Sequence, residues 1–245
     1  MNIQSLSPES SARESFLLDF NVTRETAAQF DRYAALLAEW QTRMNLVASS
    51  TMPAIWQRHF YDSAQLWPLL PKTAHSLVDI GSGAGFPGLV LALLAQMHQR
   101  PLDIHLVESI QKKAAFLRHI VQEFSLPVTV HPQRSESLSG LRADVITARA
   151  VAALPDLFRL CQPLLGADSQ LLFLKGRTVR DELTKARESW QFDCRQRPSR
   201  TPDADGGDSR GEGQGMILQI SNLRFITPRH RQALAGNKRR DRSKP

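Results

Sequence analysis

The spacing of apolar positions divides the chain near residue 75. Upstream of that point, apolar side chains recur three or four residues apart and fall on one helical face, namely Phe30, Ala34, Leu37, Trp40 and Met44. This pattern predicts a long helix over roughly residues 24–44, with Thr23 as its N-cap. A short helix is predicted around residues 11–20, and a further helix over about residues 53–70.

Downstream, short apolar runs alternate with segments of helical period. The runs that predict strands are residues 76–80, 103–107, 127–131, 144–148 and 170–175. The helical segments are about 87–98, 110–124, 152–164 and 178–189. This alternation is typical of a parallel sheet covered by helices on both faces, and right-handed crossovers make such a sheet doubly wound. The predicted fold class is therefore α/β.

The alternation stops after the last predicted helix. Residues 197–215 contain five glycines, two prolines and no large apolar residue, which indicates a mobile loop. This loop separates two predicted strands, near 191–195 and 216–220, which we expect to pair antiparallel at the sheet edge. Three parts are expected: an N-terminal helical extension (1–72), a Rossmann-like domain (73–228) and a tail (229–245).

A glycine turn follows the first predicted strand and contains Gly81, Gly83, Gly85 and Gly88. Glycine permits positive φ and a close approach of the backbone to a ligand. Taken literally, the turn matches the dinucleotide pattern G-x-G-x-x-G. Asp79 argues against that ligand, because a carboxylate just before the turn repels a pyrophosphate but attracts the sulfonium and ammonium groups of S-adenosylmethionine. We therefore favour the methyl donor over a nicotinamide dinucleotide, and a glycine turn without a ligand is the remaining alternative.

Other polar residues follow the later strands of the predicted sheet. Glu108 comes directly after the second strand, where nucleotide-binding folds place a carboxylate for the ribose. Arg149 follows the fourth strand and Lys175 ends the fifth. Ligands of open α/β sheets bind outside the carboxyl ends of the strands, so these side chains are predicted to lie at one site.

The charge of the chain is unevenly distributed. The formal net charge is +7 over 245 residues, and residues 229–245 carry seven Lys or Arg residues against one Asp. The excess is therefore a basic tail on a nearly neutral globular part. Such a tail attracts phosphate backbones without sequence specificity, although a solubilising end has the same composition.

Composition restricts the location of the protein. No apolar run approaches the ~20 residues of a membrane span, and residues 1–14 lack a signal-peptide pattern. Cys161 and Cys194 fit neither a metal site nor a redox motif. We expect a cytoplasmic protein with reduced thiols, no metal and no membrane association.

Several motifs together resemble one family of proteins. They are Asn45-Leu46, Arg58-His59-x-x-Asp62-Ser63, Val78 to Gly88, Val107-Glu108-Ser109-x-x-Lys112-Lys113-x-x-Phe116-Leu117, Arg134-Ser135-Glu136, Ala148-Arg149-Ala150 and Leu174-Lys175-Gly176. The chain resembles the glucose-inhibited division protein B (GidB) family, bacterial methyltransferases that act on N7 of a guanine in 16S ribosomal RNA. The resemblance covers about residues 20–195; the 197–215 loop looks like an insertion, and the tail matches poorly.

The resemblance implies a Rossmann-like class I fold, S-adenosylmethionine as cofactor and a decoding-region loop of the small subunit as substrate. We expect a monomer. It places donor contacts on Gly81, Phe86, Ser135, Glu136 and Arg149. The glycine turn adds Gly83 and Gly85, and the charge argument adds Asp79 and Glu108. Lys175 and His59 are candidates for positioning the RNA, although a solvent-facing lysine and a helix-surface histidine are the simpler interpretations.

The sequence shows no obvious pair of general base and nucleophile, which is expected for methylation at guanine N7. N7 has a free lone pair and no proton to lose, so alignment rather than a general base is required. Attack by an exocyclic amine usually comes with an Asn/Asp-Pro-Pro-aromatic turn, where this chain has Ala148-Arg149-Ala150-Val151. Attack by a pyrimidine carbon needs a cysteine, and Cys161 lies in an apolar helix. A small-molecule methyltransferase on the same fold and, less favoured, a nicotinamide-dependent oxidoreductase are the alternatives.

Overall fold

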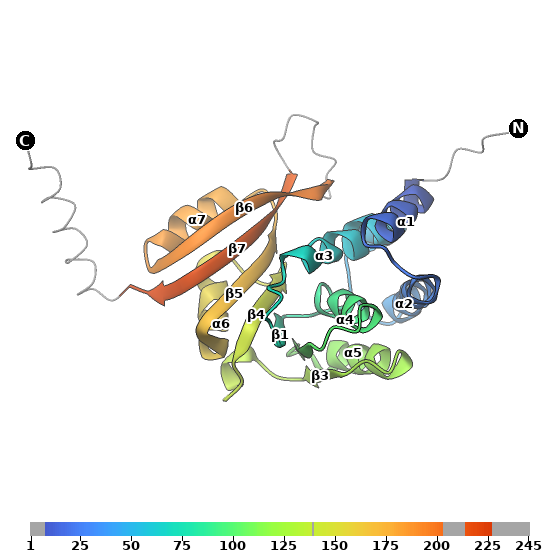
Figure 1. Ribbon diagram of the computed structural model, residues 1–245, viewed down its shortest axis with the longest axis horizontal. Helices are drawn as coiled ribbons and strands as arrows, with labels where there is room; N and C mark the ends of the chain where they lie inside the picture. Colours follow the sequence, from blue (N-terminus) through green and yellow to red (C-terminus); the bar gives the residue numbers. More distant parts are fainter. Residues whose placement is uncertain (1–7, 139, 203–213, 227–245) are drawn as a thin grey trace, which may run out of the picture.

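The computed structural model describes residues 8–138, 140–202 and 214–226. Within these residues the chain forms a seven-stranded sheet in the order β3-β2-β1-β4-β5-β7-β6 (Figure 1). The first five strands are parallel, β7 is antiparallel to β5, and β6 is antiparallel to β7. The strands are β1 Ser76–Ile80, β2 Asp103–Val107, β3 Val128–His131, β4 Ala143–Arg149, β5 Leu165–Lys175, β6 Trp190–Pro202 and β7 Gln214–Phe225. The predicted parallel sheet and the antiparallel pair at its edge are confirmed.

Helices cover both faces of this sheet. The helices that follow β1 and β2 pack on one face, and those that follow β4 and β5 pack on the other. In order they are α4 Gly88–Met97, α5 Gln111–Glu123, α6 Leu154–Cys161 and α7 Val179–Arg187. Leu77 faces the first helix layer and Val78 the second, as expected when successive side chains of a strand point to opposite faces. A strand buried on both sides explains the unbroken apolar run.

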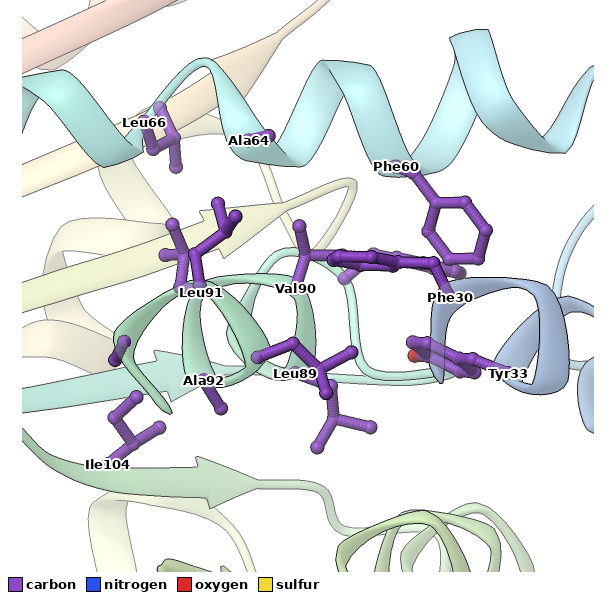
Figure 2. Packing of buried hydrophobic residues seen from close by; sticks show 14 of the residues in the cluster. Phe30, Tyr33, Phe60, Ala64, Leu66, Leu89, Val90, Leu91, Ala92 and Ile104 are labelled. Atoms are coloured by element: carbon purple, nitrogen blue, oxygen red, sulfur yellow. The ribbon is translucent and has the colours of Figure 1, made fainter. Parts of the chain in front are cut away.

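The N-terminal extension begins with two helices, α1 Pro8–Asp19 and α2 Arg24–Gln41. Thr23 caps α2 as predicted, because its hydroxyl accepts a hydrogen bond from the backbone N–H of Thr26 at 3.2 Å. The extension shares one apolar core with α4 and α5. Figure 2 shows Phe30 and Tyr33 of α2 and Phe60 of the next helical segment directed toward Leu89 of α4.

The prediction of a single regular helix over residues 53–70 is wrong, because the segment combines several helix types. The segment consists of 3-10 turns at Ser49–Ala54 and Trp67–Leu69, a π-helix at Trp56–Tyr61 and the short α3 Asp62–Ala64. A tertiary contact accounts for the wide turn: the carbonyl oxygen of Arg58 accepts a hydrogen bond from the Arg149 side chain at 2.9 Å. A side chain that binds a helix carbonyl disturbs the regular ladder, and π-helices of this kind are frequent at functional sites.

The predicted mobile loop is wrong at both ends. Residues 197–202 belong to β6, and residues 214–215 belong to β7. The pairs Arg197–Ile217 and Pro198–Met216 continue the hairpin ladder through this region. Residues 203–213 of the predicted loop, and the basic tail from 229 on, lie outside the described residues. None of the described helices is both long and apolar enough to cross a membrane.

Candidate active site

A cavity of about 600 Å³ opens at the carboxyl ends of β1, β4 and β5. Its walls come from four parts of the chain that are distant in sequence: residues 46–62 of the extension, the strand ends, Glu182 of α7, and the β6–β7 hairpin. The strand ends contribute the turn after β1 and residues 149–150 and 174–176. Part of the predicted site therefore lines this cavity, and the extension and hairpin close it.

The glycine turn has the backbone that its sequence predicts. Gly81, Gly83 and Gly85 have φ values of 64°, 56° and 95°, a region that favours glycine. A Cβ at Gly85 would collide with Leu89 and with the hydroxyl of Tyr33, and that hydroxyl donates to the carbonyl of Ala84. A Cβ at Gly83 would meet nothing closer than 3.8 Å. Gly85 is thus required by packing, whereas Gly83 leaves free space above the turn.

Asp79 lies beneath the glycine turn rather than in the cavity wall. Its side chain is fully buried. Oδ1 accepts a hydrogen bond from the Thr147 hydroxyl at 2.7 Å, and Oδ2 accepts one from the Gly88 N–H at 3.3 Å. Burial raises the pKa of Asp79 to about 6, against the lowering effect of the hydrogen bonds from Thr147, Ser82 and Gly88. The carboxylate therefore joins β1, β4 and the start of α4, and its charge acts on a ligand through the turn.

Glu108 joins the first two βα turns. One carboxylate oxygen accepts the Gly83 N–H at 2.9 Å and the other accepts the Ile110 N–H at 2.7 Å. Ser135 and Glu136 form a short 3-10 turn after β3, where the Ser135 hydroxyl donates to Glu136 at 3.3 Å. Because β3, β2 and β1 are neighbours in the sheet, these residues continue the same edge away from the cavity.

Phe86 is the aromatic centre of the site. Its ring stacks with His59, with centroids 4.8 Å apart and planes at 17°, and with Tyr33 at 5.5 Å and 16°. The guanidinium carbon of Arg149 lies 4.9 Å from the same ring centroid, within reach of a cation–π interaction. Residues from the extension, the glycine turn and β4 thus meet on one ring, although they are far apart in sequence.

Lys175 is not a solvent-facing lysine. Its ammonium group lies 2.6 Å from Glu182 of α7 and donates to the carbonyl oxygen of Ala152 at 2.8 Å. Burial raises the pKa of Glu182, but hydrogen bonds from Lys175 and Thr178 and the charge of Lys175 outweigh it and lower the pKa. Both members of the pair line the cavity, so Lys175 presents a charge that is already partly neutralised.

The predicted residues fall into two groups. Gly81, Phe86, Arg149, His59 and Lys175 surround the cavity. The others, Asp79, Gly83, Gly85, Glu108, Ser135 and Glu136, are not among the described residues that line it; they lie within or beneath the turn or farther along the sheet edge.

Sequence reasoning missed the residues that close the cavity. Ser199 and Thr201 of β6 line it and donate to the same oxygen of Asp62, at 3.2 and 2.9 Å. Asp62 belongs to the Arg58-His59-x-x-Asp62-Ser63 motif, which is the only sequence signal for this group of residues. Ser199 and Thr201 lie in a stretch rich in proline and polar residues, whose composition hides a strand.

The sequence relatives identify the family. A family model described as rRNA small subunit methyltransferase G matches residues 26–206. The chain belongs to this family. Ribosomal RNA small subunit methyltransferase G of Parvibaculum lavamentivorans is 46% identical over 225 residues, which cover 91% of this chain and 94% of that protein. The protein of the same name from Rhodospirillum centenum is 45% identical over 208 residues, covering 85% and 89%.

Solved structures agree on the fold of this methyltransferase. A putative O-methyltransferase from Klebsiella pneumoniae superposes with a TM-score of 0.53 at 15% identity, covering 87% of this chain and 97% of that one. The N-methyltransferase NodS from Bradyrhizobium japonicum, in complex with S-adenosylhomocysteine, gives 0.51 at 13% identity, covering 75% and 97%. The fold is that of the class I methyltransferases, as predicted.

The residues of the turn fit the methyl donor of the family, S-adenosylmethionine. Gly83 leaves open space above the turn, and its N–H is already bound to the Glu108 carboxylate. Two buried carboxylates, Asp79 and Glu108, stand at this turn, which opposes a pyrophosphate and favours a cationic nucleoside. The methyltransferase therefore uses S-adenosylmethionine, and the nicotinamide alternative is set aside.

Proposed function

We propose that the chain transfers the methyl group of S-adenosylmethionine to N7 of a guanine in the 16S RNA of the small ribosomal subunit. Membership of the rRNA small subunit methyltransferase G family supports an RNA substrate. The choice of N7 rests on the chemistry of the cavity.

The choice of N7 is supported by one observation: the side chains of the cavity that could accept a proton are already hydrogen-bonded or ion-paired. His59 has both ring nitrogens within hydrogen-bond distance of a partner, and burial together with the charges of Arg149 and Arg58 lowers its pKa to about 3. The remaining carboxylates among the described lining residues, Asp62 and Glu182, are bound to hydroxyls or to cations. Such groups are poor proton acceptors, and N7 is a nucleophile that needs none.

We assign the donor to the glycine turn and the neighbouring strand ends. S-Adenosylmethionine supplies an electrophilic methyl group on a sulfonium. We assign its nucleoside part to Glu108, Ser135 and Glu136, since nucleosides lie along the ends of β2 and β3 in such folds.

The amino-acid part of the donor falls to the residues nearer the cavity. They are Gly81, Gly83, Gly85, Phe86 and Arg149, with Asp79 acting through its charge below the turn. The methyl group then faces the cavity, and the protein's contribution is in-line alignment with the acceptor nitrogen.

The acceptor side of the cavity is assigned to the RNA. Lys175 lines the cavity at the end of β5, two strands from the glycine turn that follows β1, and is the candidate for contact with the guanine or its phosphate. The basic tail, residues 229–245, supplies further attraction for the phosphate backbone. One chain provides every group named here, so we propose a monomer as the active form.

A small-molecule methyltransferase remains the competing function, because fold alone does not decide the substrate. Within RNA, attack by a pyrimidine carbon would need a cysteine nucleophile, and Cys161 lies in the core at 0% exposure, where burial raises the pKa of its thiol. None of the described residues that line the cavity is a cysteine, which disfavours that route.

The test is to incubate the purified chain with methyl-labelled donor and small subunits that lack the modification, and then to digest the RNA to nucleosides. The proposal expects the label in 7-methylguanosine at one site. Label in another nucleoside, or transfer to small molecules but not to RNA, would contradict it.

A further inference from the structure

Every polar partner of the Arg149 side chain among the described residues comes from one stretch of the extension, residues 58–62. Nη1 donates to the carbonyl oxygen of Arg58 at 2.9 Å and lies 3.5 Å from Asp62 Oδ2, and Nη2 lies 2.8 Å from His59 Nδ1. The guanidinium therefore projects from β4, but its orientation is set by another part of the chain.

The contact with Arg149 fixes the tautomer of His59. A guanidinium can only donate, so Nδ1 must accept and the proton of the neutral ring must be on Nε2. That Nε2 lies 2.8 Å from the Thr51 hydroxyl, which also lies 2.7 Å from the carbonyl oxygen of Ala48. One consistent direction results: Arg149 donates to His59, His59 to Thr51, and Thr51 to Ala48.

The surroundings of His59 oppose its protonation. Arg58 lies next to it in the chain, Arg149 approaches from β4, and Phe86 covers its ring. Asp62 is the opposite charge on the adjacent turn, and its oxygens are occupied by Ser199, Thr201 and Arg149. The imidazole is 7% exposed, and a second positive charge beside the Arg149 guanidinium would be poorly solvated.

The arrangement leaves part of the guanidinium available. Of its five N–H groups, those bound to Arg58, His59 and Asp62 belong to Nη1 and Nη2. The Nε–H and one N–H of Nη2 have no partner among the described residues, and Arg149 lines the cavity. Two such donors suit an anionic group with two oxygens, such as the carboxylate of the methyl donor.

We propose that His59 is a positioning residue which, as the neutral Nε2–H tautomer and together with Asp62, holds the guanidinium of Arg149 against Phe86 so that its remaining N–H groups face the donor. This inference rests on the proposed placement of the donor beside Arg149. It gives the extension a direct part in donor binding and removes His59 from the groups that contact RNA.

The first test measures the wild-type protein and uses the conservative His59→Asn variant only for assignment. Nitrogen-15 NMR of the histidine rings, with His59 assigned by difference against that variant, is recorded between pH 6 and 8. The expected spectrum has a protonated Nε2 and an unprotonated Nδ1 throughout. A ring that carries its proton on Nδ1, or that becomes an imidazolium near pH 6, would overturn the proposal.

Variants provide the second test, with S-adenosylhomocysteine as the calorimetric probe. His59→Leu removes the acceptor for Arg149 and is expected to raise the Kd about tenfold, which corresponds to about 1.4 kcal/mol. His59→Asn keeps an acceptor near the position of Nδ1 and is expected to stay within about threefold of wild type. Equal losses in the two variants would contradict a role through Arg149.

A double-mutant cycle separates positioning from general damage. In an Arg149→Met background, adding His59→Leu is expected to change the Kd no further, and the KM for RNA is expected to stay constant. Additive losses would overturn the proposal. The two failures are distinguishable: an unexpected methylated nucleoside refutes the proposed function, whereas additive losses in a correctly methylating enzyme refute only the role of His59.

Discussion

The two sides of the cavity differ in how their residues are brought together. On the side of the glycine turn, Asp79, the turn and Glu108 lie within about thirty residues of one another and are joined by a βαβ unit. On the side formed by the extension and the hairpin, Asp62 binds Ser199 and Thr201 of β6, which are 137 and 139 positions away. The glycine-turn side is built from local sequence, whereas the side of the extension and hairpin depends on tertiary contacts.

The glycine-turn side depends on backbone geometry, and the largest effect is expected at Gly85, where both the φ angle and the packing exclude a side chain. Gly85→Ala forces a side chain to a φ of 95° and into Leu89 and Tyr33. Strain of ~1–3 kcal/mol and overpacking of ~1–3 kcal/mol predict a loss of about 2–6 kcal/mol in the free energy of unfolding, measured by urea titration.

Gly83→Ala is the matched control, because its new Cβ meets nothing within 3.8 Å. Its φ of 56° still costs about 1 kcal/mol. If both variants lost the same stability, close packing of the extension on the turn would not be what requires Gly85.

Lys175 and Glu182 form an ion pair that lines the cavity, and substitutions of its two members are expected to differ in their effect on RNA binding. Removing either partner of a largely buried pair leaves an uncompensated group, and their side chains are 9% and 14% exposed. We expect Lys175→Gln and Glu182→Gln each to lose roughly 2–3 kcal/mol of unfolding free energy. Only Lys175→Gln removes the ammonium group, so only it is expected to raise the KM for RNA at temperatures where both are folded; an equal rise in both would contradict a contact with RNA.

The two sides are also expected to respond to pH with opposite sign. The folded-state pKa of His59 is about 3, below its value of 6.5 in the unfolded chain, so its contribution to stability is lost as pH falls below 6.5. Between pH 7.5 and 5.5 this loss is about 1.4 kcal/mol. Asp79, with a pKa raised from 3.8 to about 6, instead adds about 0.8 kcal/mol over the same interval.

The corresponding variants separate the two contributions. Urea titrations at pH 7.5 and 5.5 are expected to give His59→Asn a smaller loss on acidification than wild type, and Asp79→Asn a larger one. The same direction of change in both variants would mean that one of the two pKa shifts has the wrong sign.

The last prediction concerns the basic tail and affects RNA binding rather than folding. Deleting residues 229–245 removes a net charge of +6, and this is expected to weaken RNA binding by on the order of 1 kcal/mol at physiological salt and to flatten its salt dependence. Donor affinity serves as the control and should not change. An unchanged salt slope would make the tail a solubilising segment.

The features that could be predicted from the sequence are those set by local sequence, and the features that could not are those set by tertiary contacts. The strands, the glycine turn and the position of Glu108 could be predicted, because apolar period and glycine spacing are local properties. The π-helix could not, since its form depends on Arg149, ninety-one positions from Arg58. Ser199 and Thr201 were assigned to a loop because composition does not reveal hydroxyls that bind Asp62.

The contacts of His59 and Lys175 could not be predicted from the sequence either. A lone histidine or lysine has no sequence pattern that names its partner. The family resemblance placed both near the site, but only the structure shows that His59 holds Arg149 and that Lys175 is paired with Glu182.

The central claim is that methyl transfer in this cavity proceeds by alignment, without a general base. The most direct measurement is the single-turnover rate of methyl transfer to small subunits, at saturating donor, from pH 6 to 8.5. The account predicts a rate that is independent of pH across this range, because N7 has no proton to lose and His59 stays neutral. A rate that rises tenfold per pH unit to a plateau would show a group that must lose its proton, and would contradict the account.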